Sequence, residues 1–311
     1  MAKKLHAGSL LRIKRKYQII EFLESGGFSD IYIGKNLENN RKVVIKILNN
    51  EKFDDNIQAE QYWRRERAFI NIQSKYSPYA LQLIDALVDR INPNNPKFIF
   101  ITSYINGLDF ETWFQHFQDE NRLDFYEYLI KYIFYPLSDY FAFVHSHGLI
   151  HRDFSPGNIM VTKLKHKKRI VPVVIDWGAG LNFDPATIDR IPSDLKDLPY
   201  SDDDQIFTPG YAPPEIDLSK IQIPQSDIYS FGMILHYALS GGEEPKELSG
   251  TALKRFKIQW EDYDYPEQLK IIVAKCICYE PRDRYRTFEL VRADLKKYLS
   301  SLNQNGKKKQ C

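Results

Sequence analysis

The chain has 311 residues, of which 43% are hydrophobic and 14% aromatic, enough to bury one large core or two smaller ones. Its 43 Lys and Arg residues against 41 Asp and Glu residues give a formal net charge of +2. This balance excludes a broad electrostatic attraction to nucleic acid or to an anionic membrane.

The three cysteines are too few for a disulfide framework and for a four-ligand structural zinc site. They are Cys276, Cys278 and Cys311. We interpret them as reduced thiols of a cytosol-like compartment. The first ten residues lack the apolar run of a signal peptide, and no later segment approaches the roughly 20 apolar residues of a membrane helix. The sequence therefore predicts a cytoplasmic protein without a membrane segment.

The first hundred residues read mainly as strands. Residues 17–48 alternate short apolar runs with turn residues, which predicts two or three hairpin-linked strands. Residues 54–73 carry spaced apolar residues and no helix breaker, which indicates one amphipathic helix. Two further strands, at 80–89 and 97–105, are predicted on either side of the turn-rich "NPNNP".

Beyond Gly107 the pattern becomes mainly helical. Residues 124–147 predict a buried helix with Asp124 as its N-cap, and Pro136 should kink or interrupt it. Short strands are expected near 159–162 and 170–175, on either side of "KLKHKKR".

The polar stretch 182–208 is long enough to be a functional loop or a partly disordered one. From Pro224 onward three helical segments follow, and residues 303–311 are expected to form a basic, solvated tail.

Several segments supply the parts that phosphoryl transfer needs: a cradle for phosphates, a cation to pair with them, metal ligands and an acceptor for a proton. In "LESGGFSDIY", Gly26 and Gly27 would let backbone N–H groups approach phosphate oxygens, and Phe28 could cover them. An ordinary hairpin is the alternative.

Lys46 lies in the apolar run "VVIKIL", where an ammonium group needs a carboxylate or phosphate partner unless it points to solvent. Glu66, on the predicted helix that follows, could supply that carboxylate, with Glu60 as the second candidate. A solvated helix face is the simpler interpretation of either glutamate.

The stretch "HRDFSPGN" places Asp153 and Asn158 in one tight loop, with a carboxylate to accept a hydroxyl proton and an amide oxygen to bind a metal. In "VVIDWGAG", Asp176 ends a buried strand, where a carboxylate could bind magnesium or simply cap a turn.

Lys46, Glu66, Asp153, Asn158 and Asp176 follow the order and approximate spacing of the protein-kinase signature set. On these residues the chain resembles the eukaryotic-type protein kinase family over roughly residues 17–302. The resemblance implies an α+β, bilobal protein-kinase-like fold with a small antiparallel-sheet N-lobe, carrying one main helix, and a larger, mainly helical C-lobe. The implied divisions are an N-terminal extension (1–16), the N-lobe and hinge (17–105), the C-lobe (106–302) and the basic tail (303–311).

The resemblance also implies roles for these residues. Lys46 would pair with the ATP phosphates and be held by Glu66, Asp153 would be the catalytic base, and Asn158 and Asp176 would bind Mg²⁺. The implied nucleotide-binding positions are Leu23, Gly26, Gly27, Phe28, Ile31, Val44, Lys46, Thr102, Ser103, Tyr104, Ile105 and Asp109. Among them, the backbone of residues 103–105 would supply the donor and acceptor for adenine, and Asp109 would reach the ribose.

In "TPGYAPPE", residues 208–215 resemble the end of an activation segment. There Glu215 would pair with Arg284, Thr208 would contact Asp153, and Asp227 would anchor the catalytic loop. Small-molecule kinases lack the Glu–Arg closure, so these features favour a protein kinase.

Arg152 would bind an anionic activation segment. The aspartates of "SDDDQ" at 201–205 could supply the negative charge of that segment. This interpretation predicts an enzyme that does not depend on phosphorylation for its activity.

Several positions depart from the family pattern: Glu24 and Ser29 replace loop glycines, Trp177 replaces a Phe, and Ser155 replaces the Lys usual in serine/threonine kinases. Loss of that charge weakens transition-state stabilisation. We expect an ATP- and Mg²⁺-dependent protein kinase acting on Ser or Thr of a protein substrate. The alternatives are a small-molecule kinase of the aminoglycoside or choline type and a nucleotide-binding pseudokinase scaffold. The oligomeric state is left open.

Overall fold

The computed structural model describes residues 5–12, 15–77, 80–92, 94–116, 122–164, 169–183, 207–219, 223–243 and 262–308. The chain divides into two compact units, Met1–Asn106 and Gly107–Cys311. In these described ranges the first unit contains one sheet and one long helix, and the second is mainly helical. The α+β class predicted from the sequence is confirmed.

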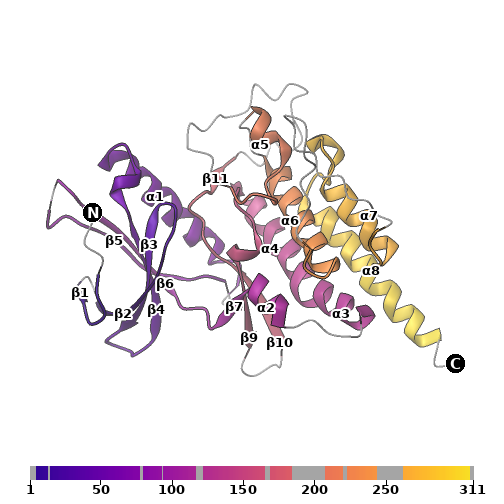
Figure 1. Cartoon of the computed structure of the whole chain (residues 1–311), viewed down its shortest axis with the longest axis horizontal. Helices are drawn as coiled ribbons and strands as arrows, with labels where there is room; N and C mark the ends of the chain where they lie inside the picture. The colour runs from indigo at the N-terminus through magenta and orange to yellow at the C-terminus, as the bar shows by residue number, and fades with distance from the viewer. Residues whose placement is uncertain are drawn as a thin grey trace. The chain divides into compact units, whose positions relative to one another are not determined.

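The first unit is built on one antiparallel sheet of six strands (Figure 1). In spatial order the strands are β1 (Leu10–Arg12), β2 (Lys16–Ser25), β3 (Ser29–Asn36), β4 (Lys42–Leu48), β6 (Lys97–Ser103) and β5 (Leu83–Asp89). The strands predicted over 17–48, 80–89 and 97–105 are confirmed. Strand β1 was not predicted: residues 1–16 were expected to precede the lobe, yet residues 10–12 pair with β2.

Both faces of this sheet carry buried apolar side chains. Helix α1 (Asn56–Gln73) begins at the N-cap Asp55, whose carboxylate accepts a hydrogen bond from the N–H of Gln58. Its Trp63 packs against Phe98 and Phe100 of β6. The alternate residues Ile99 and Ile101 point to the opposite face, where they join a cluster that includes Tyr17, Tyr32, Val43 and Ile45. The predicted helix is confirmed, and its packing fixes which side of α1 turns inward.

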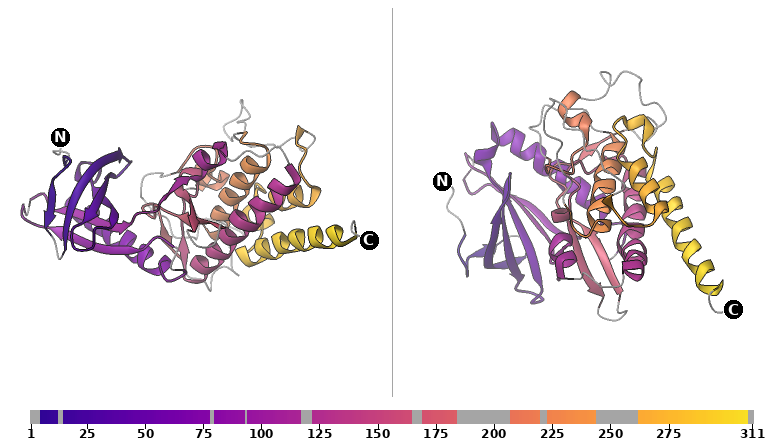
Figure 2. Two further views of the ribbon diagram at one scale, coloured as in Figure 1. Left: turned by 90° about the horizontal axis from the view of Figure 1, so that it is seen from below. Right: turned by 45° about the vertical axis from the view of Figure 1, so that its right-hand side comes forward.

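The second unit contains seven α-helices in its described ranges (Figures 1 and 2). They are α2 (Phe110–His116), α3 (Arg122–Leu129), α4 (Tyr135–Ser146), α5 (Pro214–Ser219), α6 (Pro224–Leu239), α7 (Glu267–Cys276) and α8 (Phe288–Lys308). None of the helices in the described part of the chain is long and apolar enough to cross a bilayer.

Short strands complete the second unit. Strands β7 (Gly107–Asp109), β9 (Ile159–Leu164) and β10 (Arg169–Val174) form one sheet, and β8 (Leu149–Ile150) pairs with β11 (Leu181–Asn182). The strands predicted on either side of "KLKHKKR" are confirmed as β9 and β10. The two- and three-residue strands were not predicted, because so short a run carries no visible alternation.

The helix predicted over 124–147 is interrupted. Five residues of π-helix, Ile130–Phe134, separate α3 from α4, and Pro136 lies in the first turn of α4. Proline has no N–H to donate, so it is tolerated in a first turn but not in a helix interior. The predicted interruption is confirmed, but the predicted N-cap is wrong because α3 begins at Arg122 and Asp124 lies within its first turn.

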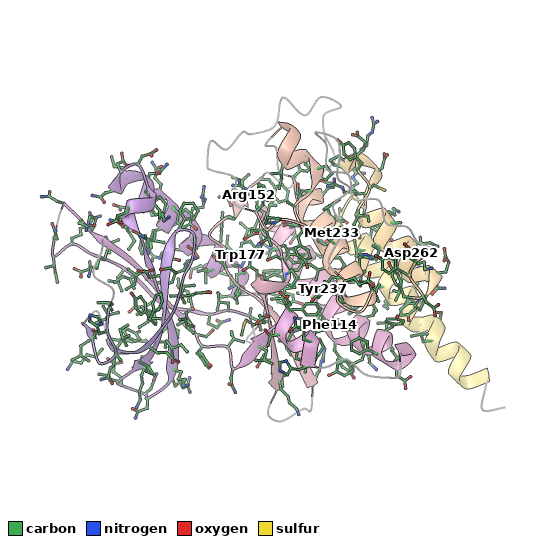
Figure 3. All side chains as sticks on the ribbon, viewed as in Figure 1. Phe114, Arg152, Trp177, Met233, Tyr237 and Asp262 are labelled. Atoms are coloured by element: carbon green, nitrogen blue, oxygen red, sulfur yellow. The ribbon has the colours of Figure 1, made fainter. Side chains whose placement is uncertain are left out.

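The core of the second unit is aromatic and surrounds α6, which is buried along its whole length. Phe231 of α6 packs edge-on against Phe134 and Phe288. Figure 3 shows Met233 and Tyr237 on the same helix, and the Tyr237 ring lies 5.6 Å from that of Phe114.

Helix α8 packs against α4 and α7 and continues to Lys308, into the segment expected to be a tail. Residues 184–206, most of the predicted loop, lie outside the described residues.

Candidate active site

The first unit brings Lys46 and Glu66 together. Lys46 Nζ on β4 lies 2.7 Å from Glu66 Oε1 on α1, and the two side chains are 13% and 2% exposed. A carboxylate buried to this degree requires a charged partner. The predicted ion pair is confirmed. The alternative, Glu60, is wrong, because it instead accepts hydrogen bonds from Arg64 and Arg90, which lower its pKa.

Four of the predicted nucleotide-binding residues share one face of the sheet. Ile31 on β3 is the cross-strand partner of Lys46, and Val44 on β4 is the partner of Thr102 on β6. Cross-strand partners point to the same face, and residues two apart on a strand do as well. The face that presents Lys46 therefore also presents Ile31, Val44 and Thr102.

The glycine-bearing loop is a tight turn between β2 and β3. The N–H of Gly26 donates to the Ser29 carbonyl at 2.8 Å, and Gly26, Gly27 and Leu23 are exposed. Phe28 was expected to cover bound phosphates. It packs against Phe53 and Tyr62 of the same unit, with both ring centroids 5.4 Å away. Covering of phosphates stays a prediction.

Ser103, at the end of β6, already forms hydrogen bonds within the first unit. The N–H of Ser103 donates to the Gln82 carbonyl at 2.9 Å, and its hydroxyl accepts from the N–H of Gln82 at 3.0 Å. Ser103 therefore cannot offer its N–H to an adenine ring. Of the three predicted positions, only Tyr104 and Ile105 remain as backbone donors.

Asp109, predicted to reach the ribose, caps a helix. Its Oδ1 accepts a hydrogen bond from the N–H of Thr112 at 2.8 Å, in the first turn of α2. The carboxylate therefore has at least one structural role. Ribose binding stays a prediction.

In the second unit, Asp227 of α6 holds the loop after β8. Its carboxylate accepts hydrogen bonds from the backbone N–H groups of His151 and Arg152, at 2.8 and 2.9 Å. Arg152, marked in Figure 3, has φ +73°, a conformation that is costly for a residue other than glycine. The predicted anchoring by Asp227 is confirmed. His145, whose Nε2 lies 2.9 Å from Asp227 Oδ2, was not predicted because it sits within a buried apolar helix.

Asp153 lies between two hydrogen-bond donors. Asn158 Nδ2 donates to the Asp153 carbonyl at 2.8 Å and to its Oδ2 at 3.2 Å. The Thr208 hydroxyl donates to Oδ1 at 2.7 Å. Burial raises the pKa of Asp153, against the opposing effects of the Thr208 hydrogen bond and nearby His151. Both predicted contacts are confirmed.

Asp176 and Asn158 are the two residues predicted to bind magnesium, and both could offer an oxygen ligand. Asp176 is exposed, follows β10 with φ +55°, and accepts a hydrogen bond from the N–H of Gly178 at 3.2 Å. The Nδ2 of Asn158 donates to Asp153, so the amide oxygen is the atom that could bind a metal. Among the described residues, no three His, Cys, Asp or Glu side chains gather to hold a metal. Mg²⁺ prefers oxygen ligands and keeps several waters, so one carboxylate and one amide oxygen are ligands that it could use.

The two departures in this region are both buried. Ser155 is 4% exposed and precedes the 3₁₀ turn Pro156–Asn158, where its carbonyl accepts from the N–H of Asn158. Trp177, also marked in Figure 3, is fully buried, and its ring lies 4.8 Å from that of His151. Trp177 therefore packs in the core, where it supports the loop after β8 through its contact with His151.

Glu215 and Arg284 form the predicted ion pair within the second unit. Both oxygens of Glu215 lie 2.7 Å from guanidinium nitrogens, and both side chains are buried. The predicted contribution of "SDDDQ" at 201–205 lies outside the described residues.

The Lys–Glu pair of the first unit and the Asp–Asn loop of the second unit are both contacts of the protein-kinase signature set. A sequence model described as "Protein kinase domain" matches residues 17–295. The chain therefore belongs to the protein kinase family.

Several curated proteins are similar to this chain. The serine/threonine-protein kinase PknA of Nostoc sp. is 27% identical over 283 residues, which cover 88% of this chain and 46% of that protein. PrkC of Bacillus subtilis is 22% identical, with coverages of 96% and 42%. PknB of Mycolicibacterium smegmatis is 25% identical, with coverages of 90% and 42%. The chain thus spans less than half the length of these relatives.

Proposed function

We propose that this chain transfers the γ-phosphate of Mg·ATP to Ser or Thr hydroxyls of protein substrates. The observation that carries the proposal is the 2.7 Å hydrogen bond from the Thr208 hydroxyl to Asp153. It is a threonine hydroxyl donating to the carboxylate assigned as the base, which is the contact that an acceptor hydroxyl needs. The three relatives compared above are serine/threonine-protein kinases by name, which supports the same acceptor class.

The residues have distinct roles in this proposal. Lys46, held by Glu66, pairs with the nucleotide phosphates, and Asn158 and Asp176 hold magnesium. Magnesium, when bound, offsets the negative charge of the phosphates. The acceptor oxygen forms a bond to the γ-phosphorus as the bond to the bridging oxygen of ADP breaks, and Asp153 takes the hydroxyl proton.

We also propose that the protein works in the cytoplasm. This rests on its cysteines, of which Cys276 and Cys278 are free in the described residues. Burial raises the pKa of both thiols, which keeps them protonated and unreactive.

The first experiment is transfer of labelled γ-phosphate from Mg·ATP to the chain itself and to a generic basic protein. Wild type is compared with Asp153→Asn and Asp176→Asn, and Asp262→Asn, an exposed carboxylate far along the chain, is the matched control. The proposal predicts label on Ser and Thr for wild type and control, and a loss of at least about a hundredfold in the two site variants.

Two other outcomes would overturn the proposal. Label on an amino alcohol or sugar but never on protein would mean a small-molecule kinase. Binding of Mg·ATP without any transfer would mean a scaffold, and Ser155 would then be the first residue to examine.

A further inference from the structure

Three aromatic rings tie the glycine-bearing loop to helix α1. Phe28 lies near the tip of the loop, Phe53 lies just before α1, and Tyr62 lies two turns into it. The centroids are 5.4 Å apart for Phe28 and Phe53, 5.4 Å for Phe28 and Tyr62, and 5.3 Å for Phe53 and Tyr62. Each ring thus contacts the other two, and we call this set the aromatic anchor. Phe28 and Phe53 are half-buried and Tyr62 is buried.

The backbone reinforces the aromatic anchor. The carbonyl of Phe28 accepts a hydrogen bond from the N–H of Asn49 at 2.9 Å, in the segment that leads to Phe53. At the base of the loop, the Ser25 hydroxyl donates to Asp30 Oδ1. The loop is therefore held at its base by a polar contact and at its tip by the aromatic anchor.

Helix α1 also carries Glu66, four residues after Tyr62. Residues four apart lie on one helix face, and both of these side chains are buried. The face of α1 that holds the loop tip is therefore the face that positions Lys46 through its 2.7 Å ion pair.

We propose that the aromatic anchor is a positioning device for the triphosphate of the nucleotide. Phe53 and Tyr62 are its positioning residues, which act by holding the loop backbone in place relative to Glu66 and Lys46. The inference rests on the proposed function, because it takes Mg·ATP as the ligand of this loop.

The two glycines of the loop explain why the aromatic anchor would matter for nucleotide binding. A loop that is mobile before binding must be ordered by its ligand, and that cost weakens the apparent affinity. Gly26 and Gly27 are exposed. An ideal Cβ on Gly27 would meet nothing within 4 Å and one on Gly26 would meet only Ser29 of the same hairpin, so no other element in the described part of the chain packs against these two glycines. The aromatic contacts supply the restraint that the glycines lack.

The test compares Tyr62→Ala, Tyr62→Phe and Phe28→Ala with wild type. Ile57→Ala, on an exposed position of the same helix, is the matched control. Amide hydrogen exchange of residues 23–30 is measured without nucleotide, and KM for ATP and kcat are measured separately. An aromatic pair contributes enough to change a binding constant roughly 2- to 12-fold.

We expect Tyr62→Ala and Phe28→Ala to speed exchange in residues 23–30 and to raise KM for ATP by that factor, with a smaller change in kcat. Tyr62→Phe keeps the ring and should match wild type, as should Ile57→Ala. If Tyr62→Ala does not fold, Phe28→Ala carries the test, because its half-buried ring is removed from the loop side.

Unchanged exchange and unchanged KM in folded Phe28→Ala would overturn the inference. So would a Tyr62→Phe variant as impaired as Tyr62→Ala, since the hydroxyl and not the ring would then matter. Failure of the proposed function looks different: wild type itself would transfer no phosphate, while the exchange experiment would still show whether the rings hold the loop.

Discussion

Arg284 and Glu215, 69 residues apart in the chain, form a bidentate ion pair shielded from solvent. The other hydrogen bonds of the guanidinium go to the carbonyls of Gln225, Cys278 and Tyr279. The charge of Arg284 is thus matched and its donors are satisfied, which is the condition under which a buried ion pair does not destabilise a protein. The pair fixes α5, which contains Glu215, to the segment between α7 and α8.

Removing one partner should therefore be costly. We predict that Arg284→Ala lowers the free energy of unfolding by about 3–5 kcal/mol, because the Glu215 carboxylate stays buried without its counter-charge. Urea denaturation at neutral pH measures the change. The control is Arg64→Ala, which breaks the surface pair with Glu60 where Arg64 is 70% exposed, and should cost less than about 1 kcal/mol. Equal losses in the two variants would refute the argument from burial.

Asp227 should be needed for the shape of the catalytic loop. In Asp227→Asn the amide has one oxygen to accept from two backbone N–H groups, so the φ +73° conformation of Arg152 loses part of its support. We predict a stability loss of about 1.5–3 kcal/mol and at least a roughly tenfold loss of kcat. Denaturation and steady-state transfer assays measure the two effects. Full kcat in the variant would show that the loop holds its shape without this carboxylate.

Most of the contacts within the candidate site could be predicted because the chemistry of these residues restricts their partners. An ammonium in an apolar strand needs a carboxylate, and a carboxylate and an amide five residues apart in a Pro-Gly loop must lie close. The choice between Glu60 and Glu66 depended on packing. These residues differ by six positions, about 240° around a helix, so only one can face the sheet, and the burial of Trp63 and Phe69 decides which.

Other features depend on contacts that a single sequence does not display. Strand β1 has only three residues, and it forms because the backbone of β2 pairs with it at the edge of the sheet. The direction of Phe28 depends on Tyr62, 34 positions away, and the Ser103 N–H is used by Gln82, which precedes β5. The cap at Asp109 is different, because it could have been predicted from the sequence. An Asp three residues before Thr112, at the start of a helix, is a typical N-cap, but the family resemblance assigns this residue to ribose binding.

Gly107 lies where β7 approaches β9 too closely for a side chain. A Cβ at this position would lie 2.2 Å from the Val161 carbonyl oxygen, which is backbone and cannot rotate away. We predict that Gly107→Ala lowers the free energy of unfolding by about 1–3 kcal/mol, as other overpacked sites do. Gly27→Ala is the control, because its Cβ would meet nothing within 4 Å, and it should leave stability nearly unchanged. Similar denaturation midpoints for wild type and Gly107→Ala would contradict the close approach.

His236 should make the stability of the protein depend on pH. It is buried in α6 beside Tyr265, whose hydroxyl lies 3.1 Å from its Nδ1, and the Tyr263 ring. Burial lowers its pKa from 6.5 to about 4. The unfolded chain therefore takes up a proton near pH 6.5, whereas the folded protein does so only near pH 4. The stabilisation is complete above pH 6.5 and declines as the pH falls, levelling off below about 4.

This linkage predicts a loss of about 2 kcal/mol between pH 7 and pH 5, and about 3 kcal/mol in total. The measurement is urea denaturation of wild type and His236→Gln at both pH values, because other groups titrate in the same range and cancel in the comparison. The variant should be less stable than wild type at pH 7, since it loses the imidazole packing, but should lose about 2 kcal/mol less on acidification. Parallel losses in the two proteins would mean that His236 titrates normally in the folded state.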